Sequence, residues 1–509
     1  MSASPATPQG APASGSVDAQ ARPTDVNRLA ASSVRPEPVE GQDGAPASIP
    51  PLHDLGAREL AARVARRELT ATDVVRHFIA RVEALNPALN AIVQFDPARV
   101  LAEAEAVDRR LAAGEQLPLA GVPFTVKDNL WVEGYRIAQG SRLFEDFVAP
   151  RDAWAVARLR ALGGVVLGIT NCSEFACKGV TSNLVYGATR HPLDPSLTPG
   201  GSSGGAVSAL ASGLGLLALA TDAGGSTRRP AAHCGLVGLK PSPGLIPHPW
   251  GFAEPNYGLS VIGVLARGVA DCAWAFDLLA AYDAGDPAGV PIPSGLTQPT
   301  PEPPPRDLRI AWSPRLGCDF AIDEDVLTQL QARVDALRAA GWQIADAAPP
   351  WPPEAREYPL IALQHAGLHA LYGEQWAADP SRIDPVLGGQ IETGARIAPA
   401  DVARALRLRE RIAHALAGFF EHYDLLLCPT APVTAWPLEQ LGPPVIGGQP
   451  AGPRGHAAFT PLFNYCGVPA CSVPAGTVRD LPVGLQVVAP RYEDARVLGF
   501  AAVVETTPG

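Results

Sequence analysis

The sequence predicts an α/β fold, and three observations support this prediction. Amphipathic helical patterns alternate with short apolar segments between residues 55 and 169. The same alternation resumes between residues 308 and 344, after a segment rich in proline and glycine. A chain of 509 residues, 47% of them hydrophobic, can also bury a large core without disulfides or metals.

Each expected element follows from a local pattern. Apolar residues recur at helical spacing in two stretches before residue 86, and Thr70 and Asp73 have the spacing of a capping box for the second stretch. Asp96-Pro97 is typical of a helix N-cap followed by a first-turn proline. In order, we expect helices over 55–64 and 70–85, a strand over 91–95, a helix from 97, a strand over 119–126, a helix over 154–162, strands over 165–169 and 308–312, a helix over 326–339 and a strand from 342.

The domain organisation is predicted from composition. Residues 1–50 contain eight Pro, ten Ala, seven Ser and four Gly but no aromatic residue, so we expect a disordered tail. Residues 51–506 are expected to form one folded domain, and residues 284–306 a surface insertion rich in proline and glycine. The sequence leaves open whether this insertion interrupts one sheet or joins two lobes.

Charge and cysteine usage exclude several classes of function. The 40 basic and 51 acidic residues give a formal net charge of −11, which argues against a nucleic-acid partner. No segment looks like a membrane span or a signal peptide, and the eight cysteines contain no C-x-x-C pair. We therefore expect free thiols and a cytoplasmic protein that uses no metal or other cofactor.

Lysine is unusually rare in this chain. Of the 40 basic residues only three are lysines, namely Lys127, Lys178 and Lys240. Arginine therefore serves wherever a generic cation is enough. The three retained lysines are candidates for a role that arginine cannot fill, because lysine can lose its proton and arginine cannot.

Two loops rich in glycine and serine are the strongest candidates for chemistry. One is Gly200-Gly201-Ser202-Ser203-Gly204-Gly205 and the other is Asp222-Ala223-Gly224-Gly225-Ser226. Consecutive main-chain N–H groups in such loops form an anion nest, which suits a developing oxyanion. With serines inside both loops, the pattern indicates acyl transfer.

Three other kinds of site fit the sequence less well. Neither loop has the Gly-Lys-Ser/Thr ending of a phosphate-binding loop. Residues 200–204 match G-x-S-x-G, but the polar, proline-containing stretch before them is not the strand that a nucleophile elbow requires. His365 and His369 could share a helix face as metal ligands, yet no acidic residue between them could act as a base.

A serine nucleophile needs a base, and a neutral lysine can replace histidine in that role. Lys127 follows the apolar stretch 121–126, so it could be buried at the inner end of a strand, where burial would lower its pKa. A lysine that merely reaches solvent at a strand end fits the pattern equally well.

Taken together, the motifs resemble those of the amidase signature family. The resemblance covers most of the chain from about Leu52 to Glu505, and the segments that carry it best are Gly121–Asn129, Thr170–Ala176, Pro199–Gly205, Thr221–Pro241 and Gly467–Gly476. It implies a single α/β domain in which helices flank both faces of a large mixed β-sheet. It also implies hydrolysis of a carboxylic amide to an acid and ammonia or an amine, without a cofactor.

The resemblance also assigns site residues. Lys127 matches the catalytic lysine, Ser202 the bridging serine that follows a cis peptide bond in the family, and Ser226 the nucleophile that forms an acyl-enzyme. The spacings of 75 residues from Lys127 to Ser202 and 24 from Ser202 to Ser226 match those of the family. The expected oxyanion hole consists of the main-chain N–H groups of Ala223, Gly224 and Gly225.

The substrate is less well defined. Arg229 either grips a substrate carboxylate or pairs within the protein, whereas Arg228 and Lys240 are expected to be structural and Lys178 has no predicted role. The stretch 245–257 lacks the usual family run near the substrate pocket, so the sequence does not predict which small-molecule amide is cleaved. Alternatives are the A component of a tRNA-dependent amidotransferase and an inactive scaffold protein, and a homodimer is left open.

Overall fold

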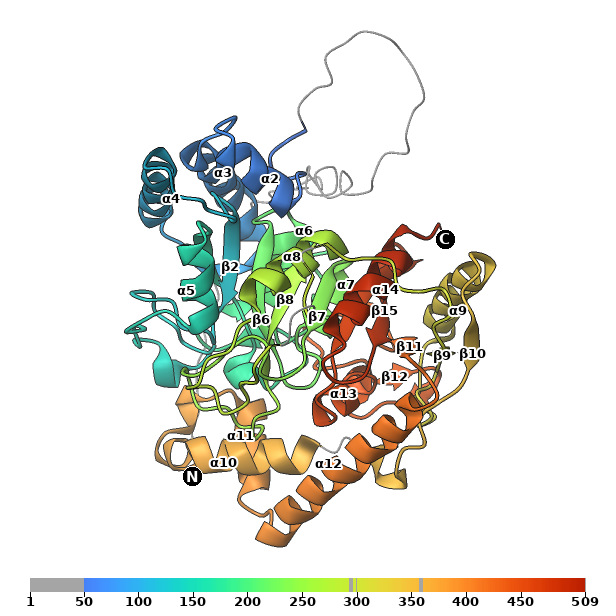
Figure 1. The fold of residues 1–509 in the computed structure, drawn as a ribbon. Helices are drawn as coiled ribbons and strands as arrows, with labels where there is room; N and C mark the ends of the chain where they lie inside the picture. Colours follow the sequence, from blue (N-terminus) through green and yellow to red (C-terminus); the bar gives the residue numbers. More distant parts are fainter. Residues whose placement is uncertain (1–49, 293–295, 299, 357–359, 509) are drawn as a thin grey trace, which may run out of the picture. The chain divides into compact units, whose positions relative to one another are not determined.

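The computed structural model describes residues 50–508 except 293–295, 299 and 357–359. Within this part of the chain, helices cover both faces of one mixed sheet of eleven strands (Figure 1), which confirms the predicted fold class. The predicted disordered tail lies outside the described residues except for Pro50. The predicted bounds of the folded domain stay a prediction.

The large sheet contains both parallel and antiparallel neighbours. Its strands are β1 (Ile92–Gln94), β2 (Pro123–Lys127), β3 (Val165–Thr170), β6 (Leu217–Asp222), β7 (Val237–Lys240), β8 (Val261–Ala266), β9 (Ile310–Trp312), β10 (Ile344–Asp346), β11 (Leu425–Pro429), β14 (Ala470–Val478) and β15 (Leu481–Val488). Their order across the sheet is β1-β3-β2-β6-β8-β7-β14-β15-β11-β9-β10. Parallel pairing joins β3, β2 and β6 on one side and β11, β9 and β10 on the other. Two small hairpins pair β4 (Ser182–Asn183) with β5 (Gly187–Ala188), and β12 (Val445–Ile446) with β13 (Gln449–Pro450).

The α-helices of the described chain pack around this sheet. They are α2 (Ala57–Ala65), α3 (Ala71–Leu89), α4 (Pro97–Ala112), α5 (Trp154–Ala161), α6 (Gly204–Ala211), α7 (Arg228–Cys234), α8 (Val269–Leu279), α9 (Glu324–Ala339), α10 (Leu360–Ala378), α11 (Pro385–Gly394), α12 (Pro399–Phe420), α13 (Pro461–Tyr465) and α14 (Asp494–Thr506). Strand β6 shows how the two faces are covered. Ala218 and Ala220 pack on α6 and α7, whereas the alternate residues Leu217 and Leu219 belong to the main core that α8 and α14 complete.

The predicted elements are found with small shifts at their ends. Thr70 Oγ1 caps α3 by accepting the N–H of Asp73 at 3.0 Å, and the Asp96 carboxylate caps α4. The predicted strand over 119–126 is wrong at its start, because turns occupy 117–122 and β2 begins only at Pro123. Gly121 has φ +69° in these turns, a conformation that ends an extended run.

Strands on both sides of the predicted insertion lie in the same sheet, because β8 precedes it and β9 follows it. The described residues of 284–306 form no helix or strand, and none of them is buried. All eight cysteines lie in the described chain and are free thiols. None of the helices described between residues 50 and 508 has the length and apolarity that crossing a bilayer requires.

Candidate active site

Lys127 is the last residue of β2, a strand in which all five residues are buried. Because β2 and β6 run parallel as neighbours, their carboxyl ends meet at one edge of the sheet and bring Lys127 to Thr221. The Lys127 Nζ atom lies 2.7 Å from Ser202 Oγ and 2.9 Å from Thr221 Oγ1. The side chain is fully buried, so the alternative of a lysine that reaches solvent is wrong. Burial lowers the pKa of Lys127 to about 8.

Ser202 lies in the first glycine-rich loop and is also fully buried. The Gly201–Ser202 peptide bond is cis. A side chain at Gly201 would come within 2.8 Å of main-chain atoms in residues 179–180, so the tight approach requires glycine there. The Thr181 hydroxyl accepts the N–H of Gly204 at 2.8 Å and fixes the loop where α6 begins. Ser202 is therefore held rigidly against Lys127.

Ser226 lies between β6 and α7 and is 7% exposed. The N–H of Gly225 donates to the Asp222 carboxylate at 2.7 Å, so this predicted oxyanion donor is already engaged. The N–H groups of Ala223 and Gly224 have no hydrogen-bond partner among the described residues. Two of the three predicted donors are thus free to bind an anion next to Ser226.

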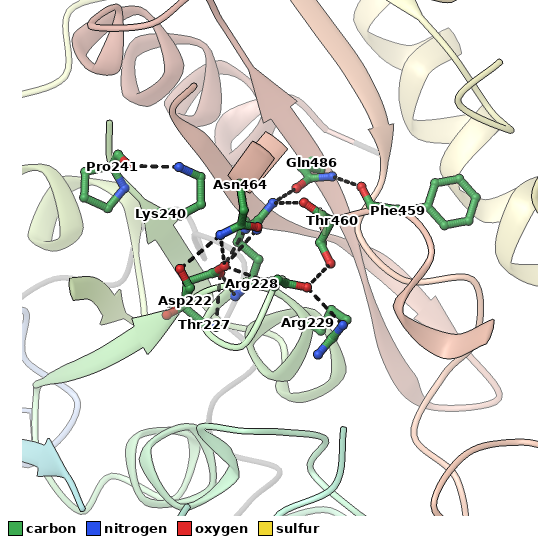
Figure 2. Close-up of polar contacts among 12 residues, drawn as sticks. Asp222, Thr227, Arg228, Arg229, Lys240, Pro241, Phe459, Thr460, Asn464 and Gln486 are labelled. Atoms are coloured by element: carbon green, nitrogen blue, oxygen red, sulfur yellow. Dashed lines mark hydrogen bonds and ion pairs between the residues drawn. The ribbon is translucent and has the colours of Figure 1, made fainter. Parts of the chain in front are cut away.

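A buried polar network holds the Ser226 loop in place (Figure 2). Arg228 is fully buried and donates two hydrogen bonds, of 3.0 and 2.8 Å, to the Asp222 carboxylate. It also donates to Asn464 Oδ1 at 2.6 Å, Gln486 Oε1 at 2.7 Å and the Thr460 carbonyl at 3.1 Å. Burial alone would raise the pKa of Asp222, but the adjacent guanidinium outweighs it and holds that pKa well below its usual range. The structural role expected for Arg228 fits these contacts.

Arg229 connects the two serine loops. Its guanidinium, in a side chain only 4% exposed, donates to the Gly224 carbonyl at 3.1 Å and to the Gly201 carbonyl at 3.3 Å. The Thr460 hydroxyl donates to the same Gly224 carbonyl at 2.8 Å (Figure 2). These bonds place the loops that carry Ser202 and Ser226 side by side. The predicted contact between Arg229 and a substrate carboxylate stays a prediction.

A small cavity of about 40 Å³ opens beside Ser226. Its lining comes from four segments that are far apart in the sequence: 129–139, 175–176, 221–226 and 248–260. The last segment overlaps the stretch 245–257, where the sequence departs from the usual family pattern. Arg229 is not among the lining residues.

A larger cavity of about 630 Å³ lies between α10, α11 and residues 441–462, and its lining is mainly apolar. Pro461 and Leu462 belong to its wall, next to the threonine that holds the Gly224 carbonyl. Its volume is in the range of pockets that hold small organic ligands. No sequence motif indicated this cavity.

The remaining lysines and the paired cysteines have structural contacts. Lys178 Nζ lies 2.5 Å from Asp384, whose carboxylate also caps α11, so this buried ion pair joins the segment after β3 to α11. Burial raises the pKa of Cys177 to about 12 and that of Cys172 further, so neither is a reactive thiolate. Lys240 donates to the Pro241 carbonyl at 2.9 Å (Figure 2).

Several residues of the site were missed by sequence reasoning. Asn129 donates to Thr221 at 2.9 Å and so completes the surroundings of Lys127, although both residues adjoin motifs that were recognised. Glu254 and Asn256 line the small cavity, and no sequence signal marked them. Metal clusters of three or more His, Cys, Asp or Glu are not found in the described chain, and His365 and His369 both lie on α10.

Comparison with known proteins gives one consistent family. The family model described as Amidase matches residues 73–498. The chain is 38% identical over 461 residues to an acylamidase of Rhodococcus erythropolis, which covers 89% of this chain and 95% of that protein. It is 35% identical over 473 residues to the A component of the Glutamyl-tRNA(Gln) amidotransferase of Thermus thermophilus, which covers 88% of this chain and 96% of that protein.

Solved structures agree with this family. A bacterial aryl acylamidase of the amidase signature enzymes superposes with a TM-score of 0.82 at 26% identity and covers 90% of this chain and 97% of that chain. The 6-aminohexanoate cyclic dimer hydrolase complexed with substrate gives a TM-score of 0.79 at 26% identity, covering 90% of this chain and 98% of that chain.

Proposed function

This chain is a member of the amidase family, and we propose that it hydrolyses the C–N bond of a carboxylic amide through an acyl-enzyme formed on Ser226. The observation that carries the proposal is the contact of 2.7 Å between Lys127 Nζ and Ser202 Oγ, made by a fully buried lysine. Because burial lowers the pKa of Lys127 to about 8, an appreciable fraction of this side chain is neutral near pH 7 and can accept a proton.

The proposed reaction starts with a proton relay. Neutral Lys127 accepts the proton of the Ser202 hydroxyl as Ser202 accepts the proton of Ser226, and the Ser226 oxygen attacks the amide carbonyl carbon. The carbonyl oxygen becomes an oxyanion, which the N–H groups of Ala223 and Gly224 stabilise.

Collapse of this tetrahedral intermediate breaks the C–N bond and completes the first half of the reaction. The relay returns its proton to the leaving nitrogen, which departs as ammonia or an amine and leaves the acyl group on Ser226. A water molecule, deprotonated by the same relay, then attacks the ester carbonyl. The second collapse releases the carboxylic acid and restores the hydroxyl of Ser226.

Two measurements on the purified chain test this proposal. A serine-reactive phosphonate should label Ser226, as peptide mass spectrometry would show, and ammonia or amine should be released from a panel of aliphatic, aryl, ureido and carboxylated amides. Ser226→Ala should abolish both, whereas Ser212→Ala at the end of α6 should leave both intact. Folded protein that is neither labelled nor active on any amide would refute the hydrolase.

The second candidate is the A component of a tRNA-dependent amidotransferase, favoured by the relative from Thermus thermophilus at 35% identity. Such a component passes its ammonia to a partner instead of working alone. Glutamine hydrolysis that appears only when a second, co-purified chain is present would support this candidate. Turnover of simple amides by the isolated chain supports the amidase.

A further inference from the structure

The small cavity beside Ser226 is lined by buried polar atoms that lack hydrogen bonds. Five side chains of its wall each present one such atom: Asn129 Oδ1, Gln139 Nε2, His248 Nε2, Glu254 Oε1 and Asn256 Oδ1. Gln139 and Asn256 are each only 5% exposed. An unpaired buried polar atom costs about 1–3 kcal/mol, so a cluster of five indicates groups that wait for a ligand.

The chemistry of these atoms indicates what the ligand offers. Three of the five, on Asn129, Glu254 and Asn256, are oxygens that accept hydrogen bonds. Burial lowers the pKa of His248, so this ring is neutral, and Glu254 is the wall's only acidic side chain. Its other oxygen, Oε2, accepts the N–H of Gly258 at 2.9 Å, which fixes the carboxyl group against the wall.

A negatively charged ligand fits this cavity poorly. It would meet the Glu254 carboxylate, and the nearby guanidinium of Arg229 donates to the Gly201 and Gly224 carbonyls and does not line the cavity. An ammonium group is complementary, because it carries a positive charge and three N–H donors. Burial raises the pKa of Glu254, and a cation beside this carboxyl group would favour its charged form.

We propose that Glu254 and Asn256 bind a protonated amine of the substrate, so that the enzyme prefers amides with an ammonium group close to the scissile carbonyl. This inference rests on the proposed amide hydrolysis at Ser226 and names its substrate class. The volume of about 40 Å³ holds roughly three water-sized groups, so only a short spacer fits between the ammonium and the carbonyl.

Matched substrates test the inference. Glycinamide, 3-aminopropanamide and 4-aminobutanamide are each compared with the neutral amide in which a methyl group replaces the ammonium, namely propanamide, butanamide and pentanamide. We expect kcat/KM to be about 10- to 100-fold higher for at least one amine than for its partner, the range that a charge-assisted hydrogen bond supplies. The assays are run near pH 8, where a primary amine of ordinary pKa, about 10, stays protonated.

Variants separate recognition from a general loss of structure. Glu254→Gln keeps the acceptor for Gly258 but removes the charge, so it should abolish the preference for the amine and leave turnover of the neutral partner unchanged. Glu145→Gln removes one exposed carboxylate elsewhere and should change neither. An equal loss on both substrates in Glu254→Gln would show that Glu254 is only structural and would overturn the inference.

Calorimetry on Ser226→Ala measures binding without turnover. Tighter binding of the amine than of its neutral partner, lost when Glu254→Gln is added, is expected. Equal affinities would overturn the inference even if wild-type enzyme cleaves both amides, and in that case the proposed hydrolase would stand. Binding of the amine without hydrolysis or phosphonate labelling in the wild type would instead support the subsite and refute the hydrolase.

Discussion

Replacing Lys127 by arginine keeps a cation but removes the ability to act as a base. A group with a pKa of about 8 is neutral in about one molecule in ten at pH 7. An arginine with a pKa of at least about 12.5 is neutral in roughly three molecules per million at the same pH. The base form therefore becomes about 30,000-fold rarer in Lys127→Arg. Since a positioned general base contributes about 10²–10⁴-fold, we expect kcat/KM to fall by roughly 10³-fold or more.

The assay is release of ammonia or amine from the best substrate of the panel, measured as a function of pH. Wild-type kcat/KM should rise with pH as Lys127 loses its proton and should level off above about pH 8, because the neutral amine is the active form. Lys127→Arg should lack this rise. The matched control is Lys178→Arg, which keeps a cation in the ion pair with Asp384 and should retain activity. Activity of Lys127→Arg within tenfold of the wild type would refute the relay.

Three further substitutions test the structural contacts. Arg228→Met leaves the buried Asp222 carboxylate without its partner and should lower the free energy of unfolding by about 3–5 kcal/mol in urea titrations, whereas a loss below about 1 kcal/mol would contradict the network. Arg229→Ala should reduce kcat/KM equally for amides with and without a carboxylate, because its bonds are to main-chain carbonyls. A selective loss on the carboxylated amide would restore the substrate contact. Lys178→Met should destabilise the chain by roughly 3 kcal/mol by stranding the Asp384 carboxylate, and unchanged thermal unfolding would show that this pair contributes nothing.

The amphipathic helices were predictable because their apolar spacing and caps are local. The caps at Thr70 and Asp96 form as expected. By contrast, the first turn of α2 is capped by the carboxylate of Asp271, which accepts the N–H of Ala57 at 2.8 Å from 214 residues away. No local pattern predicts such a contact, because only the folded chain brings the two segments together.

The catalytic candidates were predictable for a different reason. Lys127, Ser202 and Ser226 lie in motifs whose mutual spacing carries the information, although their geometry depends on the pairing of β2 with β6. The polar wall at Glu254 and Asn256 was not predictable. It belongs to a stretch without helix or strand that departs from the family pattern, and its polar atoms are informative only because folding buries them unpaired.

The three lysines show what a biased composition can and cannot reveal. All three are at most 5% exposed, in a chain that otherwise uses arginine for its cations. Burial accounts for this, because an arginine has five N–H donors to satisfy, and the structure gives Lys240 a single main-chain acceptor. Rarity therefore indicates a buried cation site and not a catalytic one. The contact with Ser202 distinguishes Lys127 from the other two, because a lysine can take up a proton only from a group that it touches.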